Sequence, residues 1–335
     1  MASLLETLRS GRVLLMDGAM GTELQRAGIG ENECYEAWNL THPDKVRAIH
    51  QAYVDAGAEV LLTNTFQANV PALSKHALAD KLELIIETGM GLARSVAGSD
   101  RFVVATFGPT AEKGDMVSSD LDEMARRLRA ARAADLWLFE TMSDTADLSL
   151  ALQCGKHFLV TSFLPVLSSW TYLKTSDGKT QTVKGIDPIS RTSRSIAELK
   201  PSGRPVRVAK GDTAIDVSKR LKRTAWLERL TIHAHGVNCG RDIGMNEIIE
   251  IIRRYRQVTD LPLFARPNAG TPARVGDRWV YPLTPEKMAE RLPELLEVGV
   301  SMVGGCCGTT PEHIAAMRPI VDAWNTKRGF PPAQA

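Results

Sequence analysis

The chain has 335 residues, of which 44% are hydrophobic and 24% are charged, and its formal net charge is only +2. This balance is typical of a globular protein and argues against bulk affinity for nucleic acid or membranes. The sequence contains no apolar run of about 18 residues, so we predict no transmembrane helix, and its amphipathic start does not resemble a secretory signal.

Five cysteines are present, which is an odd number, and three of them (Cys239, Cys306 and Cys307) stand beside glycines at the ends of predicted strands. This usage suits thiolate ligands in a reducing compartment better than a disulfide framework. We therefore predict a cytoplasmic protein. Cys34 and Cys154 lack this glycine context and are predicted to be ordinary thiols.

Short apolar segments alternate with helical stretches along the chain. The predicted strands cover residues 12–16, 59–62, 102–106, 136–139, 157–161, 231–235, 261–265 and 300–303. The predicted helices cover residues 43–56, 121–134, 245–257 and 285–298, with a short helix through Leu24 and a last one that starts at Thr310 and Pro311. Such alternation predicts parallel βα units, and eight units at this length favour an α/β fold with a single (β/α)8 TIM-type barrel over residues 1–325, followed by a tail over 326–335.

Polar or otherwise unusual residues follow most of these strands directly. They are Asp17, Asn64, Glu140, Cys239, Asn268, Cys306 and Cys307. Active sites of such barrels form at the carboxyl ends of the strands. We therefore expect these side chains, which are far apart in the sequence, to meet at one mouth of the barrel.

Residues 165–235 depart from this pattern, because they are rich in Lys, Arg, Ser and Thr and lack apolar periodicity. A basic run covers 219–223, and within the whole stretch only 231–235 is predicted to be a late strand. A structureless loop of this length is unusual inside a compact barrel. Three interpretations remain open: an inserted surface segment, a functional lid, or a sequence altered by a frameshift in the gene.

The pair Cys306–Cys307 stands between Gly304–Gly305 and Gly308. Adjacent side chains of a strand point to opposite faces, so two such sulfurs approach one point only where the chain bends, and glycine allows the bend. Cys239 lies in a similar setting after a predicted strand and would complete a three-thiolate metal site. The alternatives are that Cys239 is a small buried apolar residue and that the adjacent pair forms a disulfide or arose by chance.

Three thiolates with an exchangeable fourth ligand are typical of a catalytic zinc site, and sulfur ligands favour Zn²⁺ over Mg²⁺ or Mn²⁺. Three negative charges exceed the charge of the metal, so such a centre is a poor Lewis acid for hydrolysis. It is suited to binding a further thiol and lowering its pKa. The sequence therefore predicts alkyl transfer to sulfur, in which the substrate thiol is the nucleophile and no protein side chain has a separate catalytic role.

Six segments together resemble the homocysteine S-methyltransferase family, which includes the homocysteine-binding barrel of methionine synthase and the betaine and S-methylmethionine enzymes. They are DGAMGTEL (17–24), TNTFQAN (63–69), FGPT (107–110), FETMSD (139–144), GVNCG (236–240) and GGCCGTTPEHI (304–314). The resemblance covers about residues 1–160 and 236–325 in order.

The resemblance implies zinc-dependent methyl transfer from a small donor to homocysteine, giving methionine. The implied zinc ligands are Cys239, Cys306 and Cys307. Asp17 and Glu140 correspond to the acidic residues that bind the substrate's amino group, a role that suits carboxylates in a partly desolvated pocket. Asn64 and Thr65, within the TNTFQAN segment, complete the predicted substrate-binding set.

The donor is expected to be a small cationic molecule such as S-methylmethionine or betaine, because no folate or cobalamin module is recognised in the sequence. A cationic donor could be held by cation–π contact with Tyr35, Trp38, Trp279 or Tyr281. The alternative is a partner protein that delivers methylcobalamin or methyltetrahydrofolate. Two other functions stay open: alkyl transfer to another thiol or selenol, and a non-catalytic zinc- or thiol-binding barrel impaired by residues 165–235.

Overall fold

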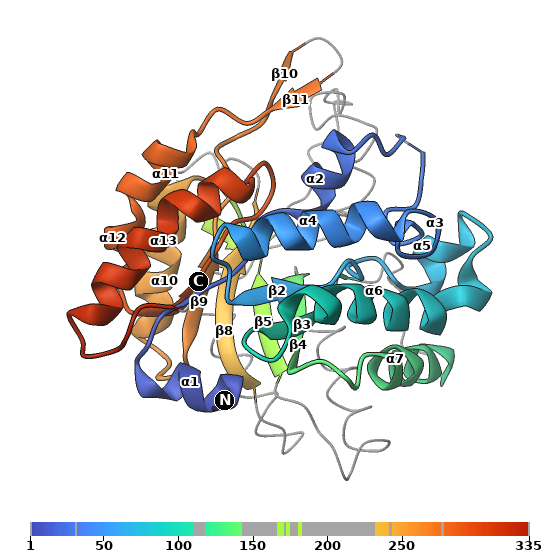
Figure 1. Cartoon of the computed structure of the whole chain (residues 1–335), viewed down its shortest axis with the longest axis horizontal. Helices are drawn as coiled ribbons and strands as arrows, with labels where there is room; N and C mark the ends of the chain where they lie inside the picture. The colour runs from blue at the N-terminus through green and yellow to red at the C-terminus, as the bar shows by residue number, and fades with distance from the viewer. Residues whose placement is uncertain are drawn as a thin grey trace.

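The computed structural model describes residues 2–30, 32–109, 118–142, 166–170, 172–174, 180–182, 232–240, 243–275 and 278–333. A parallel sheet lies at the centre of the molecule, surrounded by helices (Figure 1). Its strands are β1 (Leu14–Leu15), β2 (Val60–Leu62), β3 (Phe102–Phe107), β4 (Leu136–Met142), β5 (Val166–Trp170), β8 (Ile232–Asn238), β9 (Leu263–Arg266) and β12 (Val300–Val303).

Neighbouring strands pair in the order β1-β12-β9-β8-β5-β4-β3-β2, and every pair is parallel. The first and last strands of this order are also linked, because Met16 forms a parallel bridge with Val60. In addition, Glu59 donates its backbone N–H to the carbonyl of Leu15 at 2.7 Å, and Asp17 donates to that of Val60 at 2.9 Å. The predicted TIM-type α/β fold is confirmed.

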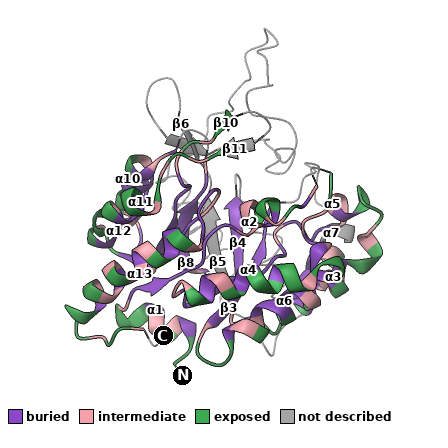
Figure 2. Cartoon of the chain, turned by 45° about the horizontal axis from the view of Figure 1, so that its top comes forward, coloured by how far each residue is buried: buried purple, intermediate pink, exposed green. Residues whose placement is uncertain are grey.

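Alternate residues of β1, β2, β3, β4 and β9 belong to two different apolar clusters, as the two-residue period of a strand requires. In β4, Leu136 and Leu138 belong to a cluster inside the sheet, whereas Trp137 and Phe139 pack in the layer beneath the helices. The interior cluster consists of Leu4, Leu8, Leu14, Met16, Val60, Leu62, Phe102, Val104, Leu136, Leu138, Ala234, Phe264 and Met302. Figure 2 shows the strands buried and the outer helix faces exposed.

Helices surround the sheet, and half of them come after a strand in the element order. They are α1 (Leu4–Ser10), α2 (Met20–Arg26), α3 (Trp38–Thr41), α4 (Pro43–Asp55), α5 (Val70–Ser74), the 3₁₀ turn η1 (Ala79–Lys81), α6 (Leu82–Ala97), α7 (Ser118–Ala130), α10 (Met245–Arg256), α11 (Pro285–Glu290), α12 (Leu292–Glu297) and α13 (Pro311–Thr326). Helix α1 begins with a Ser3–Glu6 capping box and places Leu4 and Leu8 in the interior cluster. It lies at the opposite end of the molecule from the hairpin of β10 (Ala273–Val275) and β11 (Arg278–Val280) (Figure 1).

The structure corrects one predicted helix, adds another that was not predicted, and leaves one predicted strand untested. The helix predicted over 285–298 is two helices, because Pro293 cannot donate a backbone hydrogen bond inside a continuous helix. The 16-residue helix α6, with Gly89 and Gly91 inside it, was not predicted. The strand predicted over 157–161 lies outside the described residues, and β5 takes the place between β4 and β8.

Most of the atypical stretch 165–235 also lies outside the described residues. Its described parts are β5, a small antiparallel pair of β6 (Tyr172–Lys174) with β7 (Thr180–Thr182), and the start of β8. The late strand predicted over 231–235 is confirmed as β8, which is central in the strand order. The domain boundaries and the three interpretations of this stretch stay predictions.

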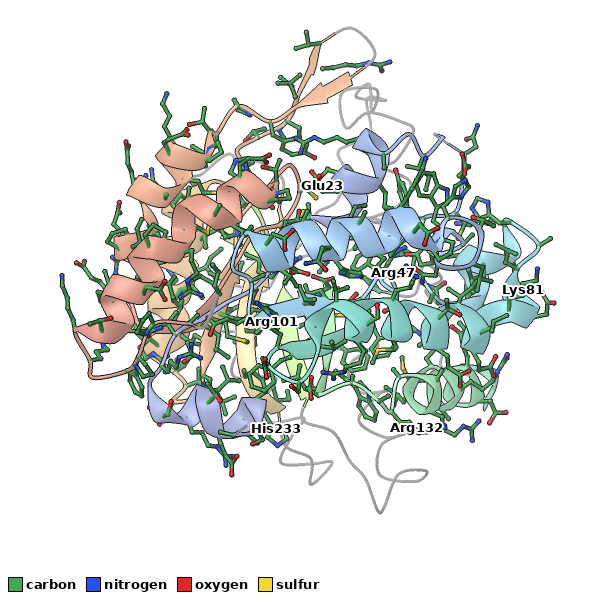
Figure 3. The ribbon with its side chains drawn as sticks, in the orientation of Figure 1. Glu23, Arg47, Lys81, Arg101, Arg132 and His233 are labelled. Atoms are coloured by element: carbon green, nitrogen blue, oxygen red, sulfur yellow. The ribbon has the colours of Figure 1, made fainter. Side chains whose placement is uncertain are left out.

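Charged side chains lie mainly on the outer faces of the helices, where Arg47 of α4 and Lys81 of η1 are exposed (Figure 3). His233, labelled in the same view, lies near α1, at the end of β8 away from Cys239. None of the helices in the described part of the chain combines the length and apolar character that crossing a bilayer requires.

Candidate metal centre and substrate pocket

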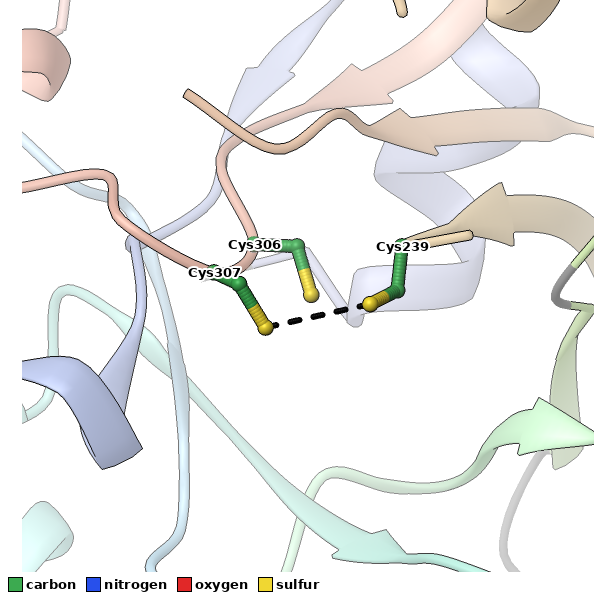
Figure 4. A group of neighbouring side chains, drawn as sticks. All are labelled: Cys239, Cys306 and Cys307. Atoms are coloured by element: carbon green, nitrogen blue, oxygen red, sulfur yellow. Dashed lines mark hydrogen bonds between the residues drawn. The ribbon is translucent and has the colours of Figure 1, made fainter. Parts of the chain in front are cut away.

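Three cysteines from two loops lie together at the carboxyl ends of the strands (Figure 4). Cys239 directly follows β8, and Cys306 and Cys307 lie in the loop between β12 and α13. Their sulfur atoms are all within 4.8 Å of one another, and the sulfurs of Cys239 and Cys307 are 3.8 Å apart. Sulfurs bound tetrahedrally to zinc at about 2.3 Å lie about 3.8 Å apart, so the spacing fits such an ion.

The loop of the cysteine pair is fixed by backbone hydrogen bonds to the loop after β9. Cys306 donates its N–H to the carbonyl of Pro267 at 2.9 Å, and Ala269 donates to the carbonyl of Cys307 at 3.0 Å. The chain also approaches Thr309 so closely that a Cβ on Gly305 would lie 2.2 Å from the Thr309 hydroxyl oxygen. The glycines around the pair are therefore needed for the bend that the sequence predicts.

Asn238 links the cysteine pair to the end of β4. Its side-chain oxygen accepts from the backbone N–H of Thr141 at 3.1 Å, and its amide nitrogen donates to the Thr141 hydroxyl at 2.8 Å. The same nitrogen lies 3.7 Å from the sulfur of Cys306. Both Thr141 and Cys239 have a positive φ, which is unfavourable for residues other than glycine and most of all for a β-branched one. Asn238 therefore stabilises a strained backbone next to the sulfurs.

Two carboxylates and one guanidinium are buried beside this cluster. Arg266, at the end of β9, donates to a Glu140 oxygen at 2.8 Å, and its other terminal nitrogen lies 3.5 Å from Oδ1 of Asp17. The second oxygen of Asp17 accepts from the backbone N–H of Leu62 at 2.7 Å. All three charged side chains are buried. The structure thus brings Asp17 and Glu140 together, with an arginine between them that the sequence analysis did not identify.

Burial dominates the ionisation of both acids. It raises the pKa of Asp17 to about 7 from an ordinary value of 3.8, although the charge of Arg266 acts in the opposite direction. It likewise raises the pKa of Glu140 to about 7 from 4.5, again against Arg266. Both carboxyl groups therefore change charge near neutral pH.

These shifts predict how stability depends on pH. Between about pH 4 and pH 7 the folded protein holds protons on Asp17 and Glu140 that the unfolded chain has released, so we expect the free energy of unfolding from these groups to decrease as pH rises. Urea denaturation of zinc-free protein at about pH 5 and about pH 8 measures the change. Asp17→Asn is expected to reduce this change in the free energy of unfolding. An identical pH dependence in the variant would contradict the raised pKa of Asp17.

Asn64 and Thr65, the other predicted substrate-binding residues, lie in the loop after β2. The amide nitrogen of Asn64 donates to the carbonyl of Tyr35 at 2.8 Å and to the side chain of Asn39 at 3.0 Å. The Thr65 hydroxyl donates to the carbonyl of Thr106 at 2.9 Å. These bonds hold the loop in place, and a contact of either residue with substrate stays a prediction.

Among the other residues singled out in the sequence, Asn268 is buried, and its amide nitrogen lies 3.5 Å from the carbonyl oxygen of Gly240 beside Cys239. The buried ring of Trp38 donates its N–H to Glu33 at 2.8 Å, and the sulfur of Cys34 lies 3.7 Å from Glu36. Cys154 is outside the described residues. Tyr281 differs from the other aromatic residues, because the nearby cysteines add to burial in raising the pKa of its phenol.

The sequence profile of the homocysteine S-methyltransferase family matches residues 14–321. The chain belongs to this family. Methionine synthases of Mycobacterium leprae and Mycobacterium tuberculosis are each 30% identical to it, over 93% and 91% of the chain respectively. In both cases the match spans 24% of the relative, so the chain corresponds to about a quarter of these longer proteins.

Solved structures of a homocysteine methyltransferase have a similar fold. The homocysteine methyltransferase MmuM from Escherichia coli, in its metallated form, superposes with a TM-score of 0.67 at 22% identity, covering 94% of this chain and 99% of MmuM. Its apo form superposes with a TM-score of 0.63 at 21% identity, covering 94% and 98%. At 21–22% identity, these superpositions show a similarity of fold alone.

Proposed function

We propose that the chain is a zinc-dependent methyltransferase that transfers a methyl group from a small donor to the thiol of homocysteine, giving methionine. The observation that carries this proposal is the convergence of Cys239, Cys306 and Cys307, whose sulfurs lie within 4.8 Å of one another at the carboxyl ends of the strands. Family membership supplies the substrate class. The buried carboxylates beside the sulfurs suit its amino group.

The three cysteines fit a zinc ion by chemistry as well as by distance. The hydrogen bond with Cys239, together with burial, raises the pKa of Cys306 to about 11, and hydrogen bonds with Cys239 and Cys306, together with burial, raise the pKa of Cys307 well above its ordinary value. The cluster by itself therefore favours neutral thiols. A divalent cation reverses this preference, because its charge stabilises the thiolates that bind it. Zinc bound here would lower the pKa of a substrate thiol that joins it, supplying a thiolate nucleophile near neutral pH.

The chain's own residues bind and orient the substrate in this reaction. Asp17 and Glu140 supply negative charge for the amino group, and the backbone bonds of the cysteine loop fix where the sulfur of homocysteine comes to lie. The thiol loses its proton, a new S–CH₃ bond forms, and the donor leaves with the electron pair of its broken bond to the methyl group. A donor with positive charge on sulfur or nitrogen is favoured, because its attack by an anionic thiolate cancels charge.

The test is methionine formation by the purified, zinc-loaded protein with homocysteine and each of three donors: S-methylmethionine, betaine, and methyltetrahydrofolate with cobalamin. Chromatography with mass detection measures the product. We expect methionine with at least one of the two small cationic donors. Product only from another thiol or a selenol, or tight zinc binding without any transfer, would contradict the proposal.

Asn238→Ala is expected to weaken zinc binding about 10–100-fold, because partners that orient metal ligands contribute about this much. The variant removes both bonds that hold Thr141 and the contact with the sulfur of Cys306. Competition with a chromophoric chelator measures the affinity. Asn325→Ala is a matched control, since Asn325 is a buried asparagine that makes two bonds to Val13 instead. Equal zinc affinity in the two variants would exclude this role of Asn238.

Glu140→Gln is expected to weaken homocysteine binding while the zinc content stays near one per chain, because the variant removes a charge from the pocket and leaves the sulfurs unchanged. Isothermal titration calorimetry measures the affinity. Glu59→Gln is the control, since Glu59 is a buried acid paired with Arg12 and Arg318 elsewhere in the barrel. Wild-type affinity in Glu140→Gln would remove Glu140 from the site.

A further inference from the structure

His313 links the start of helix α13 to the segment that follows β11. It is the third residue of α13 and is 5% exposed. Its Nδ1 accepts from the backbone N–H of Thr310 at 3.2 Å, and its Nε2 lies 2.9 Å from the carbonyl oxygen of Leu283. Because a backbone N–H only donates and a carbonyl only accepts, these partners assign a neutral imidazole with its proton on Nε2.

Leu283 belongs to a series of backbone hydrogen bonds that ends at the cysteine pair. It donates its N–H to the carbonyl of Ala269 at 3.0 Å, and Ala269 donates its own N–H to the carbonyl of Cys307 at 3.0 Å. Cys307 and His313 lie in one short stretch of chain, so these bonds form a closed network. The network joins the loop after β9, the segment after β11 and the start of α13, and the His313 side chain supplies one of its links.

The segment after β11 also places an aromatic ring against the cysteine loop. Tyr281 lies two residues before Leu283, and its ring packs so closely over Gly308 that a Cβ there would lie 2.0 Å from it. Gly308 directly follows Cys307. Release of Leu283 would therefore loosen two contacts at once: the hydrogen bond to the Cys307 carbonyl and the packing of the ring next to it.

We propose that His313 is a positioning residue of the metal centre, which holds Cys307 at the spacing that zinc requires by fixing Leu283. This inference rests on the proposed zinc site and goes beyond it, because His313 is no ligand and both of its ring nitrogens have partners. The alternative is that His313 only caps α13, since the third residue of a helix commonly accepts from the N-cap backbone N–H. A capping role would stabilise the helix without any effect on the sulfurs.

Three substitutions distinguish these two roles. His313→Ala removes both hydrogen bonds. His313→Glu keeps an acceptor for the Thr310 N–H and suits a helix N-terminus, but it turns a carboxylate oxygen toward the Leu283 carbonyl. His313→Gln has nearly the same shape and keeps an N–H donor for that carbonyl. A role in the metal centre therefore predicts that His313→Gln resembles the wild type and that His313→Glu resembles His313→Ala.

Competition with a chromophoric chelator measures the zinc affinity of each full-length variant. We expect His313→Ala and His313→Glu to lower the affinity about 3–10-fold, as loss of one hydrogen bond allows, and His313→Gln to stay within about 2-fold of the wild type. Glu6→Ala is a matched control, because Glu6 is the third residue of α1 and accepts from the Ser3 N–H at 2.7 Å in the same way. It should lower the melting temperature and leave the zinc affinity unchanged.

Two results would overturn the inference. Wild-type affinity in His313→Glu would mean that His313 only caps α13, and equal losses in His313→Gln and His313→Ala would mean that the hydrogen bond to Leu283 does not position the site. Melting temperature identifies a variant that fails to fold. If His313→Ala fails, His313→Glu and His313→Gln still decide, because both keep the helix cap. A wild-type protein that binds no zinc would instead refute the proposed function, and this inference with it.

Discussion

Cys307→Ala is expected to lose the bound zinc and with it methyl transfer to homocysteine. The sulfur of Cys307 lies 3.8 Å from that of Cys239. This is the spacing of two thiolates on one tetrahedral ion, and alanine offers no ligand atom. Loss of a residue that only orients a metal ligand lowers metal affinity about 10–100-fold. Loss of a ligand itself should therefore lower the zinc affinity by more than about 100-fold. Metal analysis after dialysis and the methionine assay measure the two effects.

Cys34→Ala provides the matched control for this variant. Cys34 is also a free thiol, but its neighbour is Glu36, and it is not among the three cysteines that could share an ion. We expect it to keep about one zinc per chain and wild-type activity. Stoichiometric zinc in the dialysed Cys307→Ala protein, or equal loss in both variants, would refute the three-cysteine site.

The barrel and the convergence of the cysteines were accessible from the sequence because both depend on local patterns. Short apolar runs that alternate with amphipathic segments indicate parallel βα units, and the carboxyl ends of such strands lie on one side. Cys239 and the pair Cys306–Cys307 each follow a strand, so the topology alone predicts that they approach one another. The glycines beside them indicate the bends that this approach needs.

Arg266 could not be predicted in the same way. In the sequence it ends a strand of ordinary apolar residues, and no spacing or motif distinguishes it from a surface arginine. Its role depends on the register of β9 against its neighbours, which points it at Glu140, 126 residues away in the chain. Asn238 was visible inside the GVNCG segment, but its bonds to Thr141 likewise depend on how β8 lies relative to β4.

The sequence analysis also missed helix α6, because this helix contains glycines as well as helix-forming residues. Helix α6 contains Gly89 and Gly91, which lower helix propensity. Burial of its apolar face against α4 and β3 outweighs that cost, since tertiary packing supplies most of the stability of a helix in a protein. A Cβ on Gly89 would lie 2.6 Å from the side-chain nitrogen of Asn39, so the glycine there permits close packing. Propensity alone does not report such a tertiary requirement.

Gly308→Ala is expected to destabilise the cysteine loop more than any other single methyl group added there, and to weaken zinc binding as a result. Gly308 has a φ of +82°, and a Cβ at this position would lie 2.0 Å from the ring of Tyr281. The strain of a left-handed alanine costs about 1–2 kcal/mol, and overpacking against the ring adds about 1–3 kcal/mol. Urea denaturation and chelator competition measure the two consequences.

Gly329→Ala separates the two causes, because Gly329 has a φ of +83° but nothing lies within 4 Å of the position that a Cβ would take there. The control should therefore show the backbone strain alone and keep wild-type zinc affinity. Since Gly308 directly follows Cys307, relief of the clash must move either the Tyr281 ring or the sulfur. Equal stability losses in the two variants would mean that the ring moves freely, and the packing of Tyr281 would then not fix the position of Cys307.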